Sequence, residues 1–261
     1  PEPATSYILK NLLNETGKLK FEKTNEKVLE KLGMVTDAVW TDFDGDNDLD
    51  IVVTGIWMPI TVLENIDNQF INSTSKFNLQ ETTGWWYSIS SDDLDNDGDD
   101  DYVLGNLGLN HKFNSQNLEL YFTDFNEDYK NDIVLAKDLE DGTKVPIRGK
   151  ECSTSQNPFV SEKIKSYKEF ANSTLADIYG TEVIANSYHK KVTEFESVYI
   201  ENKGNGEFEI KHLPIPAQLG PTMSFVFADV NHDGHLDVIG CGAIHESEVE
   251  TVKYDSNIGY I

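Results

Sequence analysis

Residues 42–50 read Asp-Phe-Asp-Gly-Asp-Asn-Asp-Leu-Asp and lead directly into the hydrophobic run Ile-Val-Val at 51–53. Every odd position of this nine-residue loop is an aspartate. Related loops occupy residues 93–101, 124–132 and 229–237, and a hydrophobic run follows each of them. A repeated unit that joins a tight turn to a strand indicates a fold built from repeated β elements.

The chemistry of these loops favours calcium as the bound ion. Calcium takes six to eight oxygen ligands at about 2.3–2.6 Å, and alternate side chains of a tight turn can converge on one point. Positions 1, 3, 5 and 9 supply side-chain oxygens, position 7 can add a carbonyl, and glycine or asparagine at position 6 suits a sharp turn. We therefore expect Ca²⁺ as the cofactor. The predicted metal-site residues are Asp42, Asp44, Asp46, Asp48 and Asp50; Asp93, Asp95, Asp97, Asp99 and Asp101; Asp124, Asn126, Asp128 and Asp132; and Asp229, Asn231, Asp233, His235 and Asp237.

Two other interpretations of the loops compete with this one. An EF-hand needs a glutamate at position 12 and a flanking helix, whereas position 12 is an apolar residue or glycine in all four loops. Solvated acidic turns without a metal are the other alternative, but like charges at this density would repel one another strongly. The third loop fits calcium least well, because Tyr129 stands where a positive φ is needed and Lys130 subtracts charge.

The net charge narrows the possible partners. Asp and Glu number 46 against 21 Lys and Arg, which gives a formal net charge of −25, so we expect no nucleic-acid partner. Of the 46 acidic residues, 18 lie in the four loops, which favours a cation. The longest nearly apolar run, residues 51–63, is too short to span a bilayer. Cys152 and Cys241 are the only cysteines and fit either two thiols or one disulfide.

A second element alternates with the acidic loops. Residues 7–21, 62–70 and 198–208 each read as a strand, a turn rich in Asn or Gly, and another strand. This alternation predicts an all-β fold of short antiparallel strands arranged radially. Residues 157–192 depart from it, because apolar residues recur there at helical spacing and a capping box begins at Thr174. We expect a small helical insertion at 157–192.

The Asp-x-Asp-x-Asp-Gly-x-x-Asp loop followed by a strand resembles the FG-GAP or VCBS repeat of integrin-like, calcium-binding β-propellers. Residues 33–40, 105–110 and 199–206 are also similar to stretches of large VCBS-repeat surface proteins of Bacteroidetes-type bacteria. The resemblance implies a seven- or eight-bladed propeller in an exported or outer-membrane-associated protein. Residues 1–261 would then form a single propeller segment, a partial ring of about four to five blades, with further repeats closing the ring.

Function can be predicted from these features only as a class. Aromatic faces suit apolar sugar faces, so Trp57 and Trp86 are candidate glycan-binding residues, with packing between blades as the alternative role. We expect a calcium-stabilised, extracellular or cell-surface module that binds a glycan or another surface protein, or acts as a scaffold. The alternative is the propeller domain of a carbohydrate-active enzyme such as a polysaccharide lyase. Such an enzyme needs a base beside an arginine or a metal, and Arg148 is the only arginine.

Overall fold

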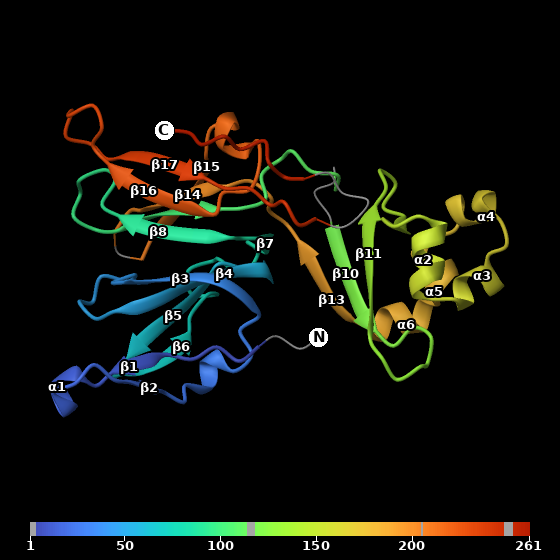
Figure 1. Cartoon of the computed structure of the whole chain (residues 1–261), viewed down its shortest axis with the longest axis horizontal. Helices are drawn as coiled ribbons and strands as arrows, with labels where there is room; N and C mark the ends of the chain where they lie inside the picture. The colour runs from blue at the N-terminus through green and yellow to red at the C-terminus, as the bar shows by residue number, and fades with distance from the viewer. Residues whose placement is uncertain (1–3, 114–117, 205, 248–252) are drawn as a thin grey trace. The chain divides into compact units, whose positions relative to one another are not determined.

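The structure is a computed structural model that describes residues 4–113, 118–204, 206–247 and 253–261. It is mostly β, with 36% of residues in strands and 16% in helices (Figure 1). The prediction of a mainly β fold is thus confirmed. The chain divides into two compact units, which we call the parent unit (Glu2–Lys112 and Glu194–Ile261) and the insert unit (Phe113–Thr193).

The parent unit contains two larger antiparallel sheets and two separate hairpins. The first sheet has the order β3-β4-β5-β6, with β7 paired to β4, and the second has the order β8-β9-β14-β15. The hairpins are β1-β2 and β16-β17. The strands are β1 (Leu9–Asn11), β2 (Phe21–Lys23), β3 (Met34–Thr41), β4 (Asp50–Met58), β5 (Thr61–Ile66), β6 (Gln69–Asn72), β7 (Gly84–Trp85), β8 (Ser88–Asp92), β9 (Asp101–Gly105), β14 (Val198–Asn202), β15 (Phe208–His212), β16 (Ser224–Ala228) and β17 (Asp237–Cys241). The short helices are α1 (Leu13–Thr16), η1 (Lys27–Leu29) and η2 (Ile215–Gln218).

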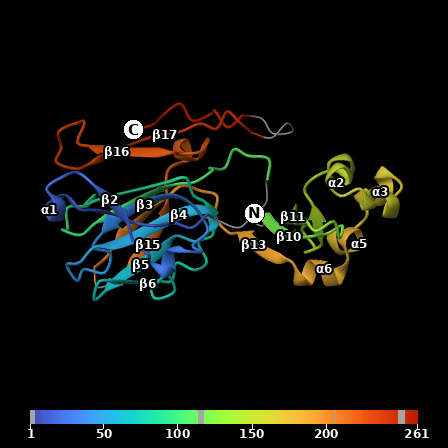
Figure 2. The same cartoon turned by 60° about the horizontal axis from the view of Figure 1, so that its bottom comes forward.

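The sheets of the parent unit form successive layers whose first strands are neighbours. β3 contacts β8, and β8 contacts β16, so β16-β17 lies beside the second sheet in both views (Figures 1 and 2). Alternate residues of each strand face the core between the first and second sheets, since side chains on a strand point to opposite faces in turn. Tyr102 and Leu104 on β9, and Val198 and Ile200 on β14, are at most 1% exposed.

Each acidic loop of the parent unit connects the first strand of a layer to its second strand. The loops join β3 to β4, β8 to β9 and β16 to β17. This succession of layers is propeller-like. The described strands do not form a closed ring, and the number of blades stays a prediction.

The insert unit has its own sheet and its own core. The sheet has the order β12-β11-β10-β13, and the third acidic loop joins β10 to β11. Tyr121 and Val134 from the sheet pack with Val160, Leu175 and other apolar residues from the helices. The elements are β10 (Leu118–Thr123), β11 (Asp132–Asp138), β12 (Lys144–Pro146), α2 (Lys150–Gln156), α3 (Phe159–Lys163), α4 (Tyr167–Ala171), α5 (Leu175–Tyr179), α6 (Thr181–Asn186) and β13 (Tyr188–Val192).

The helical segment differs from the predicted 157–192 at both ends. It begins earlier, at Lys150. The spacing of apolar residues did not predict α2, because its sequence KECSTSQ is polar and has no apolar period. It ends earlier, at Asn186, because 188–192 form β13, in which Val192 pairs with Leu118 and is fully buried. Tertiary pairing here overrides local spacing. The third loop also lies in the insert sheet, so it does not mark a further blade of the parent unit.

Two smaller expectations can be compared with the described residues. None of their helices is both long and apolar enough to cross a bilayer. Cys152 and Cys241 carry thiols instead of a disulfide.

Candidate metal centre

The four acidic loops share one backbone conformation, in which positions 4 and 6 both have a positive φ of 59–102°. The residues at these positions are Gly45 and Asn47, Asn96 and Gly98, Glu127 and Tyr129, and His232 and Gly234. The sequence pattern indicated the sharp turn only at position 6. The third loop adopts this backbone without a glycine or asparagine at either position, at a cost of about 1–2 kcal/mol for each such residue.

Hydrogen bonds from the loop backbone close each turn. In the second loop the Asp93 carboxylate accepts from the N–H groups of Asp97 and Gly98, both at 3.1 Å, and Asp97 Oδ1 accepts from the N–H of Asp99 at 3.2 Å. The same three bonds recur in the other loops at 2.7–3.1 Å. Each carboxylate oxygen has two lone pairs, so a bond to an N–H leaves capacity for a cation.

The first loop gathers three carboxylates. Oxygen atoms of Asp42, Asp44 and Asp50 lie within 4.8 Å of one another. Burial, assisted by neighbouring carboxylates, raises the pKa of Asp44 to about 6. The Lys76 ammonium, 3.4 Å from Asp44 and 2.5 Å from Glu64, offsets part of the negative charge. Neither Lys76 nor Glu64 was predicted, because both lie outside the loop and are brought to it by β5 and the segment that follows β6.

The second loop gathers Asp93, Asp95 and Asp97, whose carboxylate oxygens also lie within 4.8 Å of one another. Burial and then the charges of Asp97, Asp101 and Asp95 raise the pKa of Asp99 to about 6. Burial is the first cause of this raised pKa, and repulsion from the neighbouring carboxylates adds to it. A cation would relieve this repulsion.

The third and fourth loops bring fewer carboxylates together. Asn126 and Asn231 replace aspartate at position 3, and the described residues of these loops contain no group of three acids within 4.8 Å. In the fourth loop Asn231 Nδ2 donates to Asp233 at 2.9 Å, and His235 Nδ1 lies 3.1 Å from Asn96 Nδ2 of the second loop. The other predicted residues of these two loops are Asp124, Asp128, Asp132, Asp229 and Asp237, at positions 1, 5 and 9.

The oxygen atoms of the loops fit a hard cation. Asp44 Oδ1, Asp99 Oδ1 and Asp132 Oδ2 are buried and have no hydrogen-bond partner among the described residues. A buried acceptor without a donor is costly, and oxygen ligands without sulfur or imidazole are the set that calcium prefers. Residues at positions 1, 3, 5 and 9 would hold the ion, most completely in the first two loops.

The two tryptophans predicted to contact a ligand lie in different environments. Trp86 is 0% exposed and its indole N–H donates to the Thr82 carbonyl at 2.9 Å. The interpretation of Trp86 as a sugar-binding residue is therefore wrong, since no face of its ring reaches solvent. Trp57 is half-buried, and its ring packs edge-on against Trp85 with 5.5 Å between centroids. A ligand-binding role for Trp57 stays a prediction.

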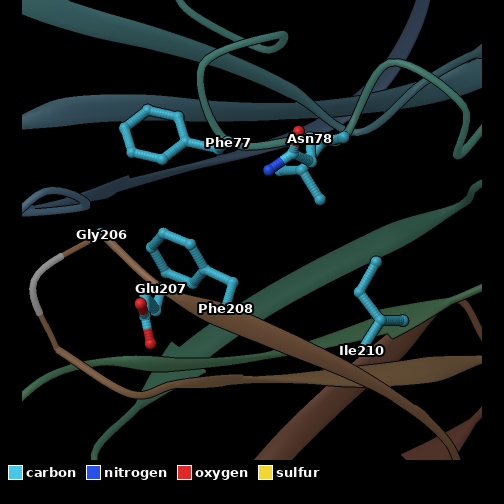
Figure 3. Close-up of a pocket in the computed structure, with 7 residues that line it drawn as sticks. Phe77, Asn78, Gly206, Glu207, Phe208 and Ile210 are labelled. Atoms are coloured by element: carbon cyan, nitrogen blue, oxygen red, sulfur yellow. The ribbon is translucent and has the colours of Figure 1, made fainter.

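A recess of about 320 Å³ lies in the parent unit between the segment after β6 and β15. Phe77 and Phe208 face each other across it (Figure 3), with 5.6 Å between ring centroids. Phe77 is only 6% exposed, and Phe208 stacks on Phe43 at 4.1 Å. These rings are therefore used in core packing and offer little aromatic face to a sugar.

One further cluster combines two glutamates with a histidine. His212 Nε2 lies 3.0 Å from Glu194, and His212 Nδ1 lies 3.6 Å from Glu196. The two ring nitrogens of His212 thus point toward different carboxylates.

The family comparison covers the part of the chain that contains the first two loops. Residues 14–104 match the family model of the FG-GAP-like repeat, a stretch that extends from α1 to β9. No curated protein matches the chain. The region that holds both three-carboxylate groups is thus similar to FG-GAP-like repeats.

Proposed function

We propose that this chain is a calcium-stabilised binding or scaffold module of an exported or cell-surface protein. The FG-GAP-like repeat and the propeller-like layers support a binding or scaffold role. The observation that carries the calcium assignment is the pair of three-carboxylate groups, Asp42-Asp44-Asp50 and Asp93-Asp95-Asp97. The pKa of Asp44, a member of the first group, and the pKa of Asp99, next to the second group, are both raised to about 6, mainly by burial.

Calcium would link the two strands that each loop connects. In each loop position 1 lies at the end of the first strand or just after it, and position 9 is the first residue of the second strand. An ion bound by both positions would hold the two strands of the layer together at that end. The second and fourth loops also meet through Asn96 and His235, so rigid loops would present one combined surface. We propose that this surface contacts a glycan or another surface protein.

Calorimetric titration of the metal-free chain with Ca²⁺ tests the ion assignment. We expect at least two sites with dissociation constants of roughly 10⁻⁴–10⁻³ M, the range of extracellular calcium modules. Mg²⁺ should bind more weakly, because it demands near-octahedral geometry at shorter distances. Absence of Ca²⁺ binding by a folded, metal-free sample would refute the proposal.

The partner class needs a separate experiment. A glycan array probed with the chain in calcium and again in chelator should give signals that calcium strengthens. Retention of glycans by a chain whose loops are unfolded would contradict a role for the loop surface.

A further inference from the structure

The first and second acidic loops are matched in sequence and in hydrogen bonding. Each has aspartate at all five odd positions, and in each the aspartate at position 1 accepts from the N–H at position 6, at 2.9 and 3.1 Å. The aspartate at position 9 also accepts from an amide of the third strand, that of Asn65 on β5 at 2.7 Å or that of Asn202 on β14 at 2.9 Å. We therefore looked outside the loops for a residue that would make them bind a cation differently.

Lys76 lies beside the first loop and is such a residue. Its ammonium is 2.5 Å from Glu64 Oε1 and 3.4 Å from Oδ2 of Asp44, the aspartate at position 3 of the loop. The other oxygen of that carboxylate, Asp44 Oδ1, is buried and has no hydrogen-bond partner among the described residues. A metal ion bound at Oδ1 would share the Asp44 carboxylate with the ammonium, and the two positive charges would repel each other.

The fold holds Lys76 in this position. Lys76 belongs to the turn that follows β6, where its N–H donates to the Ser73 carbonyl at 2.8 Å. Ser73 Oγ donates in turn to Glu64 Oε2 at 2.5 Å, and the Lys76 ammonium lies 4.9 Å from the centre of the Phe77 ring. Glu64 is only 7% exposed, so its charge needs the ammonium as a partner. The Lys76–Glu64 pair is thus part of the folded structure around the first loop.

The second sheet offers no equivalent of Lys76 to its own loop. Residues 213–220, the segment that follows β15, read LPIPAQLG and contain no basic residue. Glu201, which precedes the asparagine of the third strand just as Glu64 does, is paired with Lys203 and Lys211. Within the described part of the chain, neither of these lysines forms an ion pair with an aspartate of the second loop.

We propose that Lys76 competes with calcium for Asp44, so that the second loop binds calcium more tightly than the first. This inference rests on the proposed function, because it takes calcium as the ion of both loops. In the metal-free protein the Lys76 ammonium neutralises part of the charge of the first loop. When calcium binds there, the ammonium withdraws to Glu64, its other acceptor. The second loop lacks such a lysine in the described structure, so its stability depends more strongly on calcium.

Calcium titration followed by NMR measures the two loops separately in the intact chain. The amides of Asn47 and Gly98 occupy position 6 of the two loops and donate to the aspartate at position 1, so their chemical shifts report calcium binding at each site. We expect the Gly98 midpoint to lie at a calcium concentration about fivefold below the Asn47 midpoint, the upper end of the effect of one exposed ion pair. The reverse order of the two midpoints would overturn the proposal.

Removal of the lysine charge tests the competition directly. Lys76→Met keeps the apolar length of the side chain, and it should lower the Asn47 midpoint by about fivefold while the Gly98 midpoint stays unchanged. Lys203→Met is the matched control, because Lys203 is also partly exposed and paired with a glutamate, but in the second sheet. An Asn47 midpoint that Lys76→Met leaves unchanged, or that Lys203→Met lowers equally, would overturn the proposal.

Glu64→Gln gives an independent test of opposite sign. Glutamine keeps an oxygen that can accept from Ser73 Oγ but removes the charge to which the ammonium withdraws. The ammonium should then remain at Asp44, and the Asn47 midpoint should rise by about threefold or more. A midpoint that stays constant or falls would overturn the proposal.

Unfolding temperatures in calcium and in chelator give a second readout. Without its ammonium the first loop of Lys76→Met should be less stable in chelator, so calcium should raise the unfolding temperature of this variant by more than that of the original protein. An equal rise would overturn the proposal. If calcium moves neither amide of the original protein, the calcium assignment fails and this inference fails with it. If calcium moves both amides and Lys76→Met changes neither midpoint, only this inference fails.

Discussion

Replacement of Asp97 by asparagine should stabilise the metal-free protein but not the protein in calcium. Asparagine keeps the Oδ1 that accepts from the Asp99 N–H at 3.2 Å, so the turn retains its hydrogen bond. Without calcium the change removes repulsion from carboxylates whose oxygens lie within 4.8 Å. Two unit charges that far apart repel by about 0.9 kcal/mol in bulk water and by about 3.5 kcal/mol at an effective dielectric constant of 20.

The exposure of Asp97 decides which of these magnitudes applies. Water screens the pair, so a gain of about 1 kcal/mol is expected in metal-free solution. With calcium present the variant loses one charged ligand. A site with a dissociation constant of roughly 10⁻⁴–10⁻³ M contributes about 1–2 kcal/mol at millimolar Ca²⁺. Asp97→Asn should lose most of that contribution, which exceeds or cancels the gain.

Thermal unfolding in about 5 mM Ca²⁺ and in chelator is the assay. For a chain of this size 1 kcal/mol shifts the midpoint by about 2–4 °C, so the variant should melt about 2–4 °C above the parent protein in chelator and at or below it in calcium. Asp92→Asn is the matched control, because it removes one charge next to the loop but lies outside the three-carboxylate group. A shift of the same sign and size in both conditions would refute the reasoning.

Four other perturbations test the geometry of the loops and the core. Tyr129→Gly should raise the free energy of unfolding by about 1 kcal/mol, because Tyr129 has φ 68° and its side chain is 99% exposed. Gly98→Ala, at φ 102°, should lower the free energy of unfolding by a similar amount. Denaturant unfolding measures both changes. The folded-state pKa values of Asp44 and Asp99 are raised from 3.8 to about 6, so the metal-free protein should gain stability as pH falls from above 6 toward 4. The apparent calcium affinity should fall over the same pH interval, because protons compete with the ion. Melting curves and calcium titrations across pH measure both effects, and a loss of metal-free stability between pH 6 and pH 4 would contradict the prediction. Trp86→Ala should cost about 3–5 kcal/mol in denaturant unfolding, and a near-neutral result would contradict its place in the core.

The local chemistry of the loops could be predicted because it depends on residues close in sequence. Positions 1, 5, 6 and 7 of each loop form their turn with one another, so the spacing of Asp42 and Asp46 alone was informative. Lys76 and Glu64 escaped prediction because their place beside Asp44 depends on strand pairing. The positive φ at position 4 also escaped prediction, although Gly45 and Asn96 are residue types that often adopt it; only Glu127 is unusual there.

Longer-range organisation was predicted less well. Residues 188–192 continue a segment with helical spacing, yet they form β13 because β10 offers an edge with which to pair. Adjacent Trp85 and Trp86 look alike in sequence, but only the packing between two sheets decides that Trp86 is fully buried. The third acidic loop keeps the spacing of the motif with Tyr129 and Lys130 as departures, and nothing in the motif indicates that it belongs to a separate compact unit.

The insertion between β9 and β14 has a consequence for how the chain folds. Leu104 can pair with Val198 only after the whole insert unit has been synthesised. Until then the edge of β9 that pairs with β14 has no partner strand. The ends of the insert unit are themselves paired, since Leu118 on β10 lies opposite Val192 on β13. If the insert folds first, the loop that remains to be closed is roughly fivefold shorter, which lowers the entropic cost of closure by about 1.4 kcal/mol. The folded insert would then act as a short connection between β9 and β14. Variants that destabilise the insert should therefore slow the formation of the second sheet.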